Sequence, residues 1–540
     1  MHDYIAGMTL EEQVGQVLAV GFHETTPSQD IINLIQNHHI GNIILFKRNI
    51  QNVQQVRELT HSLQMIARES GHRYPLLIMI DQENGMVRRF GQSTTIFPGS
   101  MALGAIGSEQ IAYDIALATG RELKALGINM NLAPVVDVNN NPANPVIGVR
   151  SFGEDPQLVA RLGVAMVKGY RAAGIITSLK HFPGHGDTAV DSHLALPIIR
   201  YAMERLEAVE LLPFKSGIEA GADSVMIAHM YLPSLMQDGM IPSTVSRAIV
   251  TELLRKKLGF SGLVVSDCME MQALADTVGT EQGTVKALQA GIDLVLVSHH
   301  YSRQRGSLEA IQAAVQDGTL SADRVRQAAE RVLQLKASRL TWDNLPDATG
   351  TELIGNEAHR QLRDRAYELS TTLVRDVDGL LPLRLQPEEG LFILFLQPTN
   401  ATQAIDADLA DDALVANIQK RHEHVNTLSI ASQPTSHEYE AIYQAVKQAA
   451  ITIVVTANAN LDSYQGHLMR QLLQTGRPII GIAAHNPYDL LAFPELGTYL
   501  VTYEYTEPAF AAGVRVLFGE IQAQGHLPVS LPGLYSLTHN

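Results

Sequence analysis

Short apolar runs alternate with longer amphipathic segments over roughly the first 300 residues of the chain. Each run is mostly apolar, as expected for a strand that is buried on both faces. Such runs occupy 16–22, 41–46, 75–81, 128–137, 174–182, 223–230, 262–267 and 291–298. The segments between them carry helical patterns, and the apolar residues of one fall on a single helical face: Val56, Leu59, Leu63 and Ile66.

This repeated strand–helix alternation predicts a (β/α)8 TIM barrel, with a doubly wound open sheet as the alternative. Helix signals agree with it, because Thr9 and Glu12 form a capping-box pattern and Ser108 can cap a helix that ends near Gly127. Polar residues at the ends of the runs favour the barrel, which would bring them together at one mouth. These residues are Asp81, Asp137, Lys180 with His181, His229, Asp267 and Ser298.

The second part of the chain has its own alternation. Two helical patterns, at 307–317 and 321–339, precede a turn-rich segment without periodicity, so we place the domain boundary there. Later apolar runs predict a three-layer α/β/α sandwich around a mainly parallel sheet, and they lie at 391–396, 424–430, 451–457, 478–484 and 498–505. The expected organisation is a barrel domain at 1–340, a linker at 341–351 and an α/β/α sandwich domain at 352–540.

Composition narrows the class of protein. Hydrophobic residues make up 46% of the chain and charged residues 18%, which suits a soluble globular protein. The net charge of −16 argues against nucleic acid or an anionic membrane surface as the main partner. Cys268 is the single cysteine, so an intramolecular disulfide is excluded. We find neither a signal-peptide pattern nor an apolar stretch of about 18–20 residues, and we expect a cytoplasmic protein.

The stretch KHFPGHGDTAVDSH, residues 180–193, concentrates histidines and aspartates among glycines and a proline. Its composition predicts a loop that either binds a metal or moves protons. The candidate nitrogen and oxygen ligands for zinc or manganese are His181, His185, Asp187, Asp191 and His193, although their spacing matches no metal geometry known to us. A third interpretation is that these histidines only bond the backbone or face solvent.

The proton-transfer interpretation depends on two neighbours in this loop. A carboxylate such as Asp191 beside His193 would orient the imidazole and stabilise its protonated form. His193 could then act as a general acid and afterwards as a general base. Asp267 ends the run GLVVSD and is placed to act as a carboxylate nucleophile, which is the logic of retaining glycoside hydrolysis.

Further stretches match a known pattern in the same order as this loop. They are GNIILFKRNI (41–50), IDQENGMVRRF (80–90), NLAPVVDVN (131–139), IGVRSFGEDP (147–156), VMIAHMYLP (225–233), GFSGLVVSDCMEM (259–271), YEYTEPAF (503–510) and GHLPVSLP (525–532). Together they resemble the bacterial β-N-acetylglucosaminidases of glycoside hydrolase family 3, over nearly the whole chain. One departure is Asn84, which stands where that pattern has glycine; asparagine tolerates left-handed backbone better than most residues.

The resemblance implies a role for each matching residue. Asp267 would form the glycosyl–enzyme, His193 would be the acid/base group, and Asp191 would be its partner. The residues that would hold the sugar in the −1 subsite are Asp81, Arg150, Lys180 and His181. We also expect the positive charges of Lys180 and Arg150 to keep Asp267 ionised. The resemblance implies neither a metal nor another cofactor.

The implied activity is the retaining, exo-acting release of terminal non-reducing β-linked N-acetylglucosamine from small glycans. Muropeptide fragments, in peptidoglycan recycling, are the first candidate substrates and chitin oligosaccharides the second. The alternatives are a β-N-acetylglucosaminide phosphorylase, since a neutral histidine base would not repel phosphate, a β-glucosidase, a metal-dependent hydrolase and a non-catalytic sugar-binding protein.

The expected partner is thus a small glycan, without nucleic acid or membrane, and the expected state is a monomer or weak homo-oligomer. We expect no catalytic residue from the second domain, where His485 and Asn486 are predicted to be loop residues. Cys268 is predicted to be a small apolar filler beside the candidate nucleophile.

Overall fold

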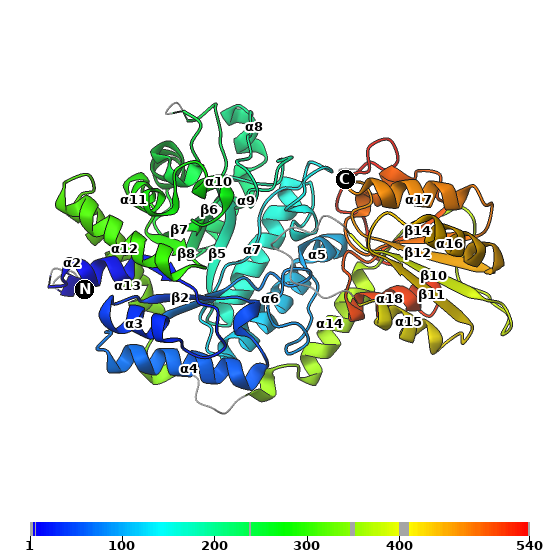
Figure 1. Cartoon of the computed structure of the whole chain (residues 1–540), viewed down its shortest axis with the longest axis horizontal. Coiled ribbons are helices and arrows are strands. Elements are labelled where there is room, and N and C mark those ends of the chain that lie inside the picture. The colour runs from blue at the N-terminus through cyan, green and yellow to red at the C-terminus, as the bar shows by residue number, and fades with distance from the viewer. Residues whose placement is uncertain (1–3, 6, 237–238, 346–350, 399–409, 538–540) are drawn as a thin grey trace.

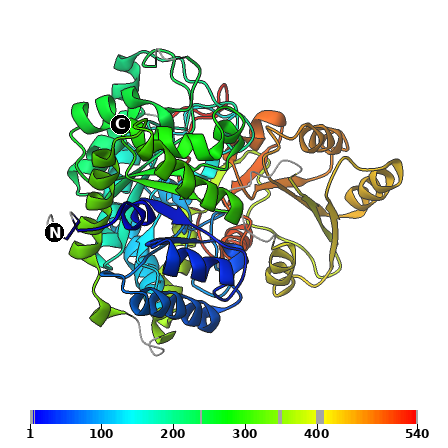
Figure 2. The same ribbon diagram turned by 60° about the vertical axis from the view of Figure 1, so that its left-hand side comes forward.

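A computed structural model describes residues 4–5, 7–236, 239–345, 351–398 and 410–537 of the chain. Its two bodies are a closed barrel of eight parallel strands and a six-stranded sheet between layers of helices (Figure 1). They lie side by side in both views of the molecule (Figure 2). The predicted barrel and sandwich are therefore confirmed, and the open doubly wound sheet is wrong for the first part of the chain.

The barrel strands follow the predicted apolar runs in chain order. They are β1 (Leu18–Val20), β2 (Asn42–Leu45), β3 (Leu77–Ile80), β4 (Met130–Asn131), β5 (Ile176–Phe182), β6 (Ser224–Ile227), β7 (Leu263–Cys268) and β8 (Leu294–Val297). Each strand pairs in parallel with its neighbour, and β1 pairs with β8 to close the ring. β4 is much shorter than the run 128–137 that predicted it, because Pro134 has no N–H to give to the strand ladder.

Helices surround the barrel, and their ends follow the sequence signals. Thr9 and Glu12 form the predicted capping box, and the Ser108 hydroxyl accepts the Ile111 N–H at the start of α6. The helices are α2 (Leu10–Gln16), α3 (Gln29–Asn37), α4 (Val53–Glu69), α5 (Ser100–Ile106), α6 (Glu109–Ala125), α7 (Pro156–Ala172), α8 (Met203–Ala208), α9 (Leu211–Glu219), the π-type helix η4 (Ala248–Lys257), α10 (Gln272–Ala275), α11 (Thr280–Ala290), α12 (Tyr301–Gln316) and α13 (Ala322–Arg339).

The second sheet has the strand order β11-β10-β12-β13-β14-β9. Its strands are β9 (Thr372–Asp376), β10 (Leu391–Leu396), β11 (Val425–Ile430), β12 (Ile451–Thr456), β13 (Ile479–Ala483) and β14 (Thr498–Val501). The strands β10 to β14 are parallel, as predicted, whereas β9 is an antiparallel edge strand that the apolar pattern missed. Helices α16 (Ser436–Gln448) and α17 (Ser463–Leu473) lie on one face, and helices α15 (Asp411–Gln419) and α18 (Glu507–Leu517) lie on the other (Figure 1).

Helix α14 (Glu357–Ser370) joins the two bodies, since it contacts α5 and α6 of the barrel as well as α18. Of the predicted linker, residues 346–350 lie outside the described residues, and short helical turns at Trp342–Asn344 and Thr351–Leu353 flank them. The exact domain boundary stays a prediction. In the part of the chain that the structure describes, no helix is both long and apolar enough to cross a membrane.

A buried lysine lies away from the barrel mouth. Lys336 on α13 is 1% exposed, and its Nζ donates to Gln16 Oε1 at 3.0 Å and to Gly41 O at 2.7 Å. Both acceptors are neutral, so the charge of the ammonium group is not balanced by them. Burial lowers the pKa of Lys336 to about 7.

Lys336→Met should therefore flatten part of the pH dependence of stability. The unfolded chain keeps a lysine pKa of about 10.4, so between the two pKa values it binds more protons than the folded chain. The free energy of unfolding of the wild type, relative to that of the variant, should thus increase by about 1 kcal/mol per pH unit as the pH rises from about 7 to about 9. Denaturant unfolding at several pH values measures this, and parallel curves for the two proteins would contradict it.

Candidate active site

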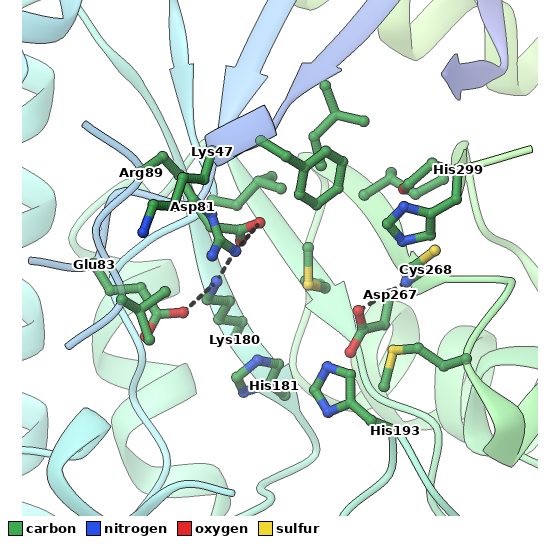
Figure 3. A pocket seen from close by; sticks show the side chains of 18 of the residues that line it. Lys47, Asp81, Glu83, Arg89, Lys180, His181, His193, Asp267, Cys268 and His299 are labelled. Atoms are coloured by element: carbon green, nitrogen blue, oxygen red, sulfur yellow. Dashed lines mark hydrogen bonds and ion pairs between the residues drawn. The ribbon is translucent and has the colours of Figure 1, made fainter. Parts of the chain in front are cut away.

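A cavity of about 320 Å³ opens at the carboxyl ends of the barrel strands (Figure 3). It is the mouth at which the strand-end residues were predicted to meet. Most of the predicted site residues line it, namely Asp81, Arg150, Lys180, His181, His193 and Asp267. The remaining one, Asp191, is buried and contacts His193.

Asp81, directly after β3, faces two cations. Lys180 Nζ donates to Asp81 Oδ1 at 2.7 Å, and Arg89 Nη2 lies 3.3 Å from Asp81 Oδ2. Burial alone would raise the pKa of Asp81, but Lys180 and Arg89 lower it below its usual value. The carboxylate is therefore ionised, and its partly exposed side chain can accept hydrogen bonds from a sugar hydroxyl.

Glu83 is a member of this cluster that sequence reasoning missed. Its carboxylate receives Nε and Nη2 of Arg150, both at 2.8 Å, and Lys180 Nζ at 2.7 Å. These buried cations outweigh the effect of burial and hold the pKa of Glu83 well below its usual range. The only available signal was an acidic residue two positions after a strand-end aspartate.

Asp137, buried in the loop after β4, orients His181. Its Oδ2 lies 2.7 Å from His181 Nδ1, and its Oδ1 accepts the His185 N–H at 2.7 Å. Arg150 Nη2 lies 3.2 Å from His181 Nε2. Because a guanidinium can only donate, Nε2 accepts from Arg150 and the ring proton is on Nδ1, facing Asp137.

The Asp191–His193 pair has the contact that proton transfer requires. His193 Nδ1 lies 2.7 Å from Asp191 Oδ1, and the same oxygen accepts the His193 N–H at 2.9 Å. The His193 side chain is 23% exposed, and it points into the cavity that Asp267 lines (Figure 3). Its Nε2 is therefore the ring nitrogen left to face a substrate.

Asp267 lies on β7, and its Oδ1 accepts the Cys268 N–H at 2.7 Å. Burial would raise its pKa, but His229, His181 and His193 lower it, so the carboxylate is ionised. The expectation that Lys180 and Arg150 do this is not supported, because those cations are paired with Asp81 and Glu83.

Comparison with known proteins agrees with this geometry. The model for the glycosyl hydrolase family 3 N-terminal domain matches residues 9–335. The chain belongs to glycoside hydrolase family 3.

Three similar proteins cover most of the chain. It is 32% identical to beta-hexosaminidase A of Pseudoalteromonas piscicida, and the match covers 94% of this chain and 92% of that protein. A solved family 3 β-N-acetylglucosaminidase from Paenibacillus sp. str. FPU-7 has 39% identity and a TM-score of 0.92, covering 98% and 100% of the two chains. A fungal multi-domain family 3 β-N-acetylglucosaminidase has 43% identity and a TM-score of 0.93 over 98% of this chain, which spans 61% of the fungal one.

The family 3 cavity is also lined by Arg48, which sequence reasoning missed, and by Cys268. Arg48 donates to the carbonyls of Phe22 and Ser298, each at 2.8 Å, and its guanidinium lies 4.3 Å from the centre of the Phe46 ring. Cys268 is partly exposed there and is not simply a buried filler. Burial raises its pKa to about 12, so the thiol stays protonated at neutral pH.

The histidines of the 180–193 loop have separate partners. His185 places Nδ1 2.8 Å from the Thr188 hydroxyl and Nε2 2.9 Å from the Ser192 hydroxyl, whereas His181 and His193 each face a different aspartate. Burial lowers the pKa of His185 to about 4. Among the described residues, no group of three or more His, Cys, Asp or Glu side chains could hold a metal ion. The candidate ligand set of the loop is thus not assembled.

Two further expectations concern the backbone at Asn84 and the loop residues His485 and Asn486 of the second domain. Asn84 adopts φ 71°, so it does occupy the left-handed region where the family pattern has glycine. His485 and Asn486 lie in a loop after β13, as predicted, and both are buried. A Cβ atom at Gly148 would lie 2.8 Å from Asn486 Oδ1, so the second domain packs against the turn that carries Arg150.

Glu83→Ala should strongly destabilise the chain, because Arg150 and Lys180 would stay buried with one carboxylate fewer. Breaking a buried pair of this kind costs about 3–5 kcal/mol. Denaturant unfolding at neutral pH measures the loss. Glu252→Ala is the control, since Glu252 pairs with Lys256 on the surface, and its stability should scarcely change. Equal losses in the two variants would refute the structural importance of Glu83.

Proposed function

We propose that this chain is a retaining, exo-acting β-N-acetylglucosaminidase that removes terminal non-reducing N-acetylglucosamine from small glycans. The observation that carries the proposal is one cavity that holds an ionised carboxylate, Asp267, and a histidine, His193, oriented by Asp191. The names of the similar proteins support the choice of sugar.

In the first step, Asp267 attacks the anomeric carbon and the bond to the aglycone oxygen breaks. Asp267 Oδ1 accepts the Cys268 N–H, so we assign the attack to Oδ2. Protonated His193 gives its Nε2 proton to the departing oxygen, since its Nδ1 faces Asp191. The products are a covalent glycosyl–enzyme, a neutral His193 and the free aglycone.

In the second step, neutral His193 takes a proton from water at Nε2, and the oxygen of that water attacks the anomeric carbon. The bond to Asp267 breaks and restores its carboxylate. Two displacements at one carbon retain its configuration. Asp191 stabilises the imidazolium in both steps because its carboxylate lies 2.7 Å from Nδ1.

The sugar is held by the charged cluster beside the reacting groups. Asp81 accepts from sugar hydroxyls, while Lys180 and Arg150 donate to hydroxyl or N-acetyl oxygens. His181 lines the same cavity, with its two ring nitrogens bound to Asp137 and Arg150. The cavity of about 320 Å³ is at the small end of ligand sites, which favours one terminal sugar over the middle of a polymer. We propose muropeptide fragments in peptidoglycan recycling as the natural substrates, and chitin oligosaccharides as the second candidates.

Hydrolysis of p-nitrophenyl β-N-acetylglucosaminide tests the proposal. Activity should survive a chelator and fall to background in Asp267→Ala. His193→Ala should lose less with this substrate than with an unactivated disaccharide, for which about 10²–10⁴-fold is expected, because nitrophenolate needs little protonation.

Loss of wild-type activity on chelation would favour the metal-dependent alternative instead. Faster turnover of the matching glucoside would favour a β-glucosidase, and binding of N-acetylglucosamine without turnover a sugar-binding protein.

The product formed in phosphate buffer distinguishes hydrolysis from phosphorolysis. Water is the proposed acceptor, so free N-acetylglucosamine should dominate with and without phosphate, at equal rates. A neutral histidine base does not repel an anion, and accumulation of N-acetylglucosamine 1-phosphate would assign the chain to the phosphorylase alternative. Phosphorus NMR of the reaction mixture identifies the product, with buffer lacking phosphate as the control.

A further inference from the structure

A carboxylate of the second domain reaches the back of the sugar-binding cluster. Glu504 lies in the loop after β14 and is 2% exposed. Its Oε1 accepts the Gly99 N–H of the barrel domain at 2.6 Å. Its Oε2 accepts the hydroxyl of Tyr367, on α14, at 2.7 Å. Glu504 therefore ties together the barrel, the joining helix and the second sheet.

The barrel segment that Glu504 contacts is packed too closely for side chains. A Cβ atom at Gly85 would lie 2.8 Å from Gly99 Cα and 3.1 Å from Glu504 Oε1. Gly85 has φ 59°, and its N–H donates to Phe97 O at 3.1 Å. The turn at Gly85 is thus held directly against Gly99 and the Glu504 carboxylate.

This turn determines where Glu83 lies. The Glu83 N–H donates to Val87 O at 3.1 Å, and the Val87 N–H donates to Asn84 O at 3.2 Å, which closes the turn. Arg88 Nη1 holds it from the side by donating to Gly85 O at 2.8 Å. Glu83 and Glu504 line the same narrow cavity, together with Arg150. A shift of the turn would consequently move the carboxylate that holds Arg150 and Lys180.

We propose that Glu504 is a positioning residue through which the second domain fixes the sugar-binding cluster of the barrel. The chain of contacts runs from Glu504 through Gly99 and Gly85 to Glu83. The second domain then contributes to substrate binding without touching the substrate, which the sequence did not lead us to expect. The kinetic consequence rests on the proposed function; the local structural consequence does not.

The test compares Glu504→Ala with Glu504→Gln and with a control at another domain contact. Glutamine keeps an oxygen for the Gly99 N–H, whereas alanine keeps none. Ser530→Ala is the control, because the Ser530 hydroxyl bonds Glu154 of the barrel, whereas the nearest neighbours of Gly85 are Gly99 and Glu504. Burial raises the pKa of Glu504 to about 7, against the effect of its two hydrogen bonds and of Arg88, so the assays are run at about pH 8.5, where it is ionised.

The kinetic readout is the split between KM and kcat for the N-acetylglucosaminide. Glu504→Ala should raise KM about tenfold, which corresponds to one hydrogen bond, and should change kcat less. Glu504→Gln should stay within about twofold of wild type, and Ser530→Ala should match wild type. Tyr367→Phe, which removes one donor to Glu504, should raise KM about threefold and keeps the test decisive if Glu504→Ala does not fold.

The structural readout is amide hydrogen exchange of peptides from residues 82–99. Exchange there should rise several-fold in Glu504→Ala and stay unchanged in Ser530→Ala. Wild-type KM together with wild-type exchange in Glu504→Ala or, if it does not fold, in Tyr367→Phe would overturn the proposal. If the wild type turns over no N-acetylglucosaminide, the proposed function fails, and the exchange data alone still decide the role of Glu504.

Discussion

The site depends on one buried ammonium group. Lys180 is 2% exposed and lies 2.7 Å from carboxylate oxygens of both Asp81 and Glu83, while Arg150 closes the cluster from the other side of Glu83. Charges taken out of water stay ionised only when such partners are in place. Because these residues come from the β3–α5 loop, from β5 and from the turn before α7, their pairing also fixes three separate segments at the mouth of the barrel.

The same physics separates the histidines of one loop into different chemical roles. His185 is buried between two hydroxyl groups, and its low pKa keeps it neutral. His181 has both ring nitrogens committed, to Asp137 and Arg150. His193 alone among the three is partly exposed, with a carboxylate on one nitrogen and the cavity on the other. Environment, and not residue type, decides which histidine can exchange a proton with a substrate.

Sequence patterns predicted the architecture because burial on both faces makes the segments that form the barrel strands mostly apolar. They also found the strand-end residues, since parallel strands bring their carboxyl ends together. The apolar pattern did not predict the edge strand β9, because β9 is only partly buried and its residues form no apolar run. The contacts between distant residues could not be predicted for another reason. Glu83 and Arg150 are 67 positions apart, and Glu504 and Gly99 are 405 apart. No local pattern encodes a contact over such separations.

The edge of the second sheet is where the two domains are in close contact. Open α/β sheets usually bind ligands at the carboxyl ends of their strands. Here barrel loops occupy that edge: Asn460 after β12 donates to Pro142 O at 2.8 Å, Asn486 after β13 packs on Gly148, and Glu504 after β14 bonds Gly99. Two of these contacts support the segments that carry Arg150 and Glu83. The edge of the second sheet thus supports the barrel segments that carry Arg150 and Glu83. These barrel loops, which line the cavity, pack against the second domain and do not face water on that side.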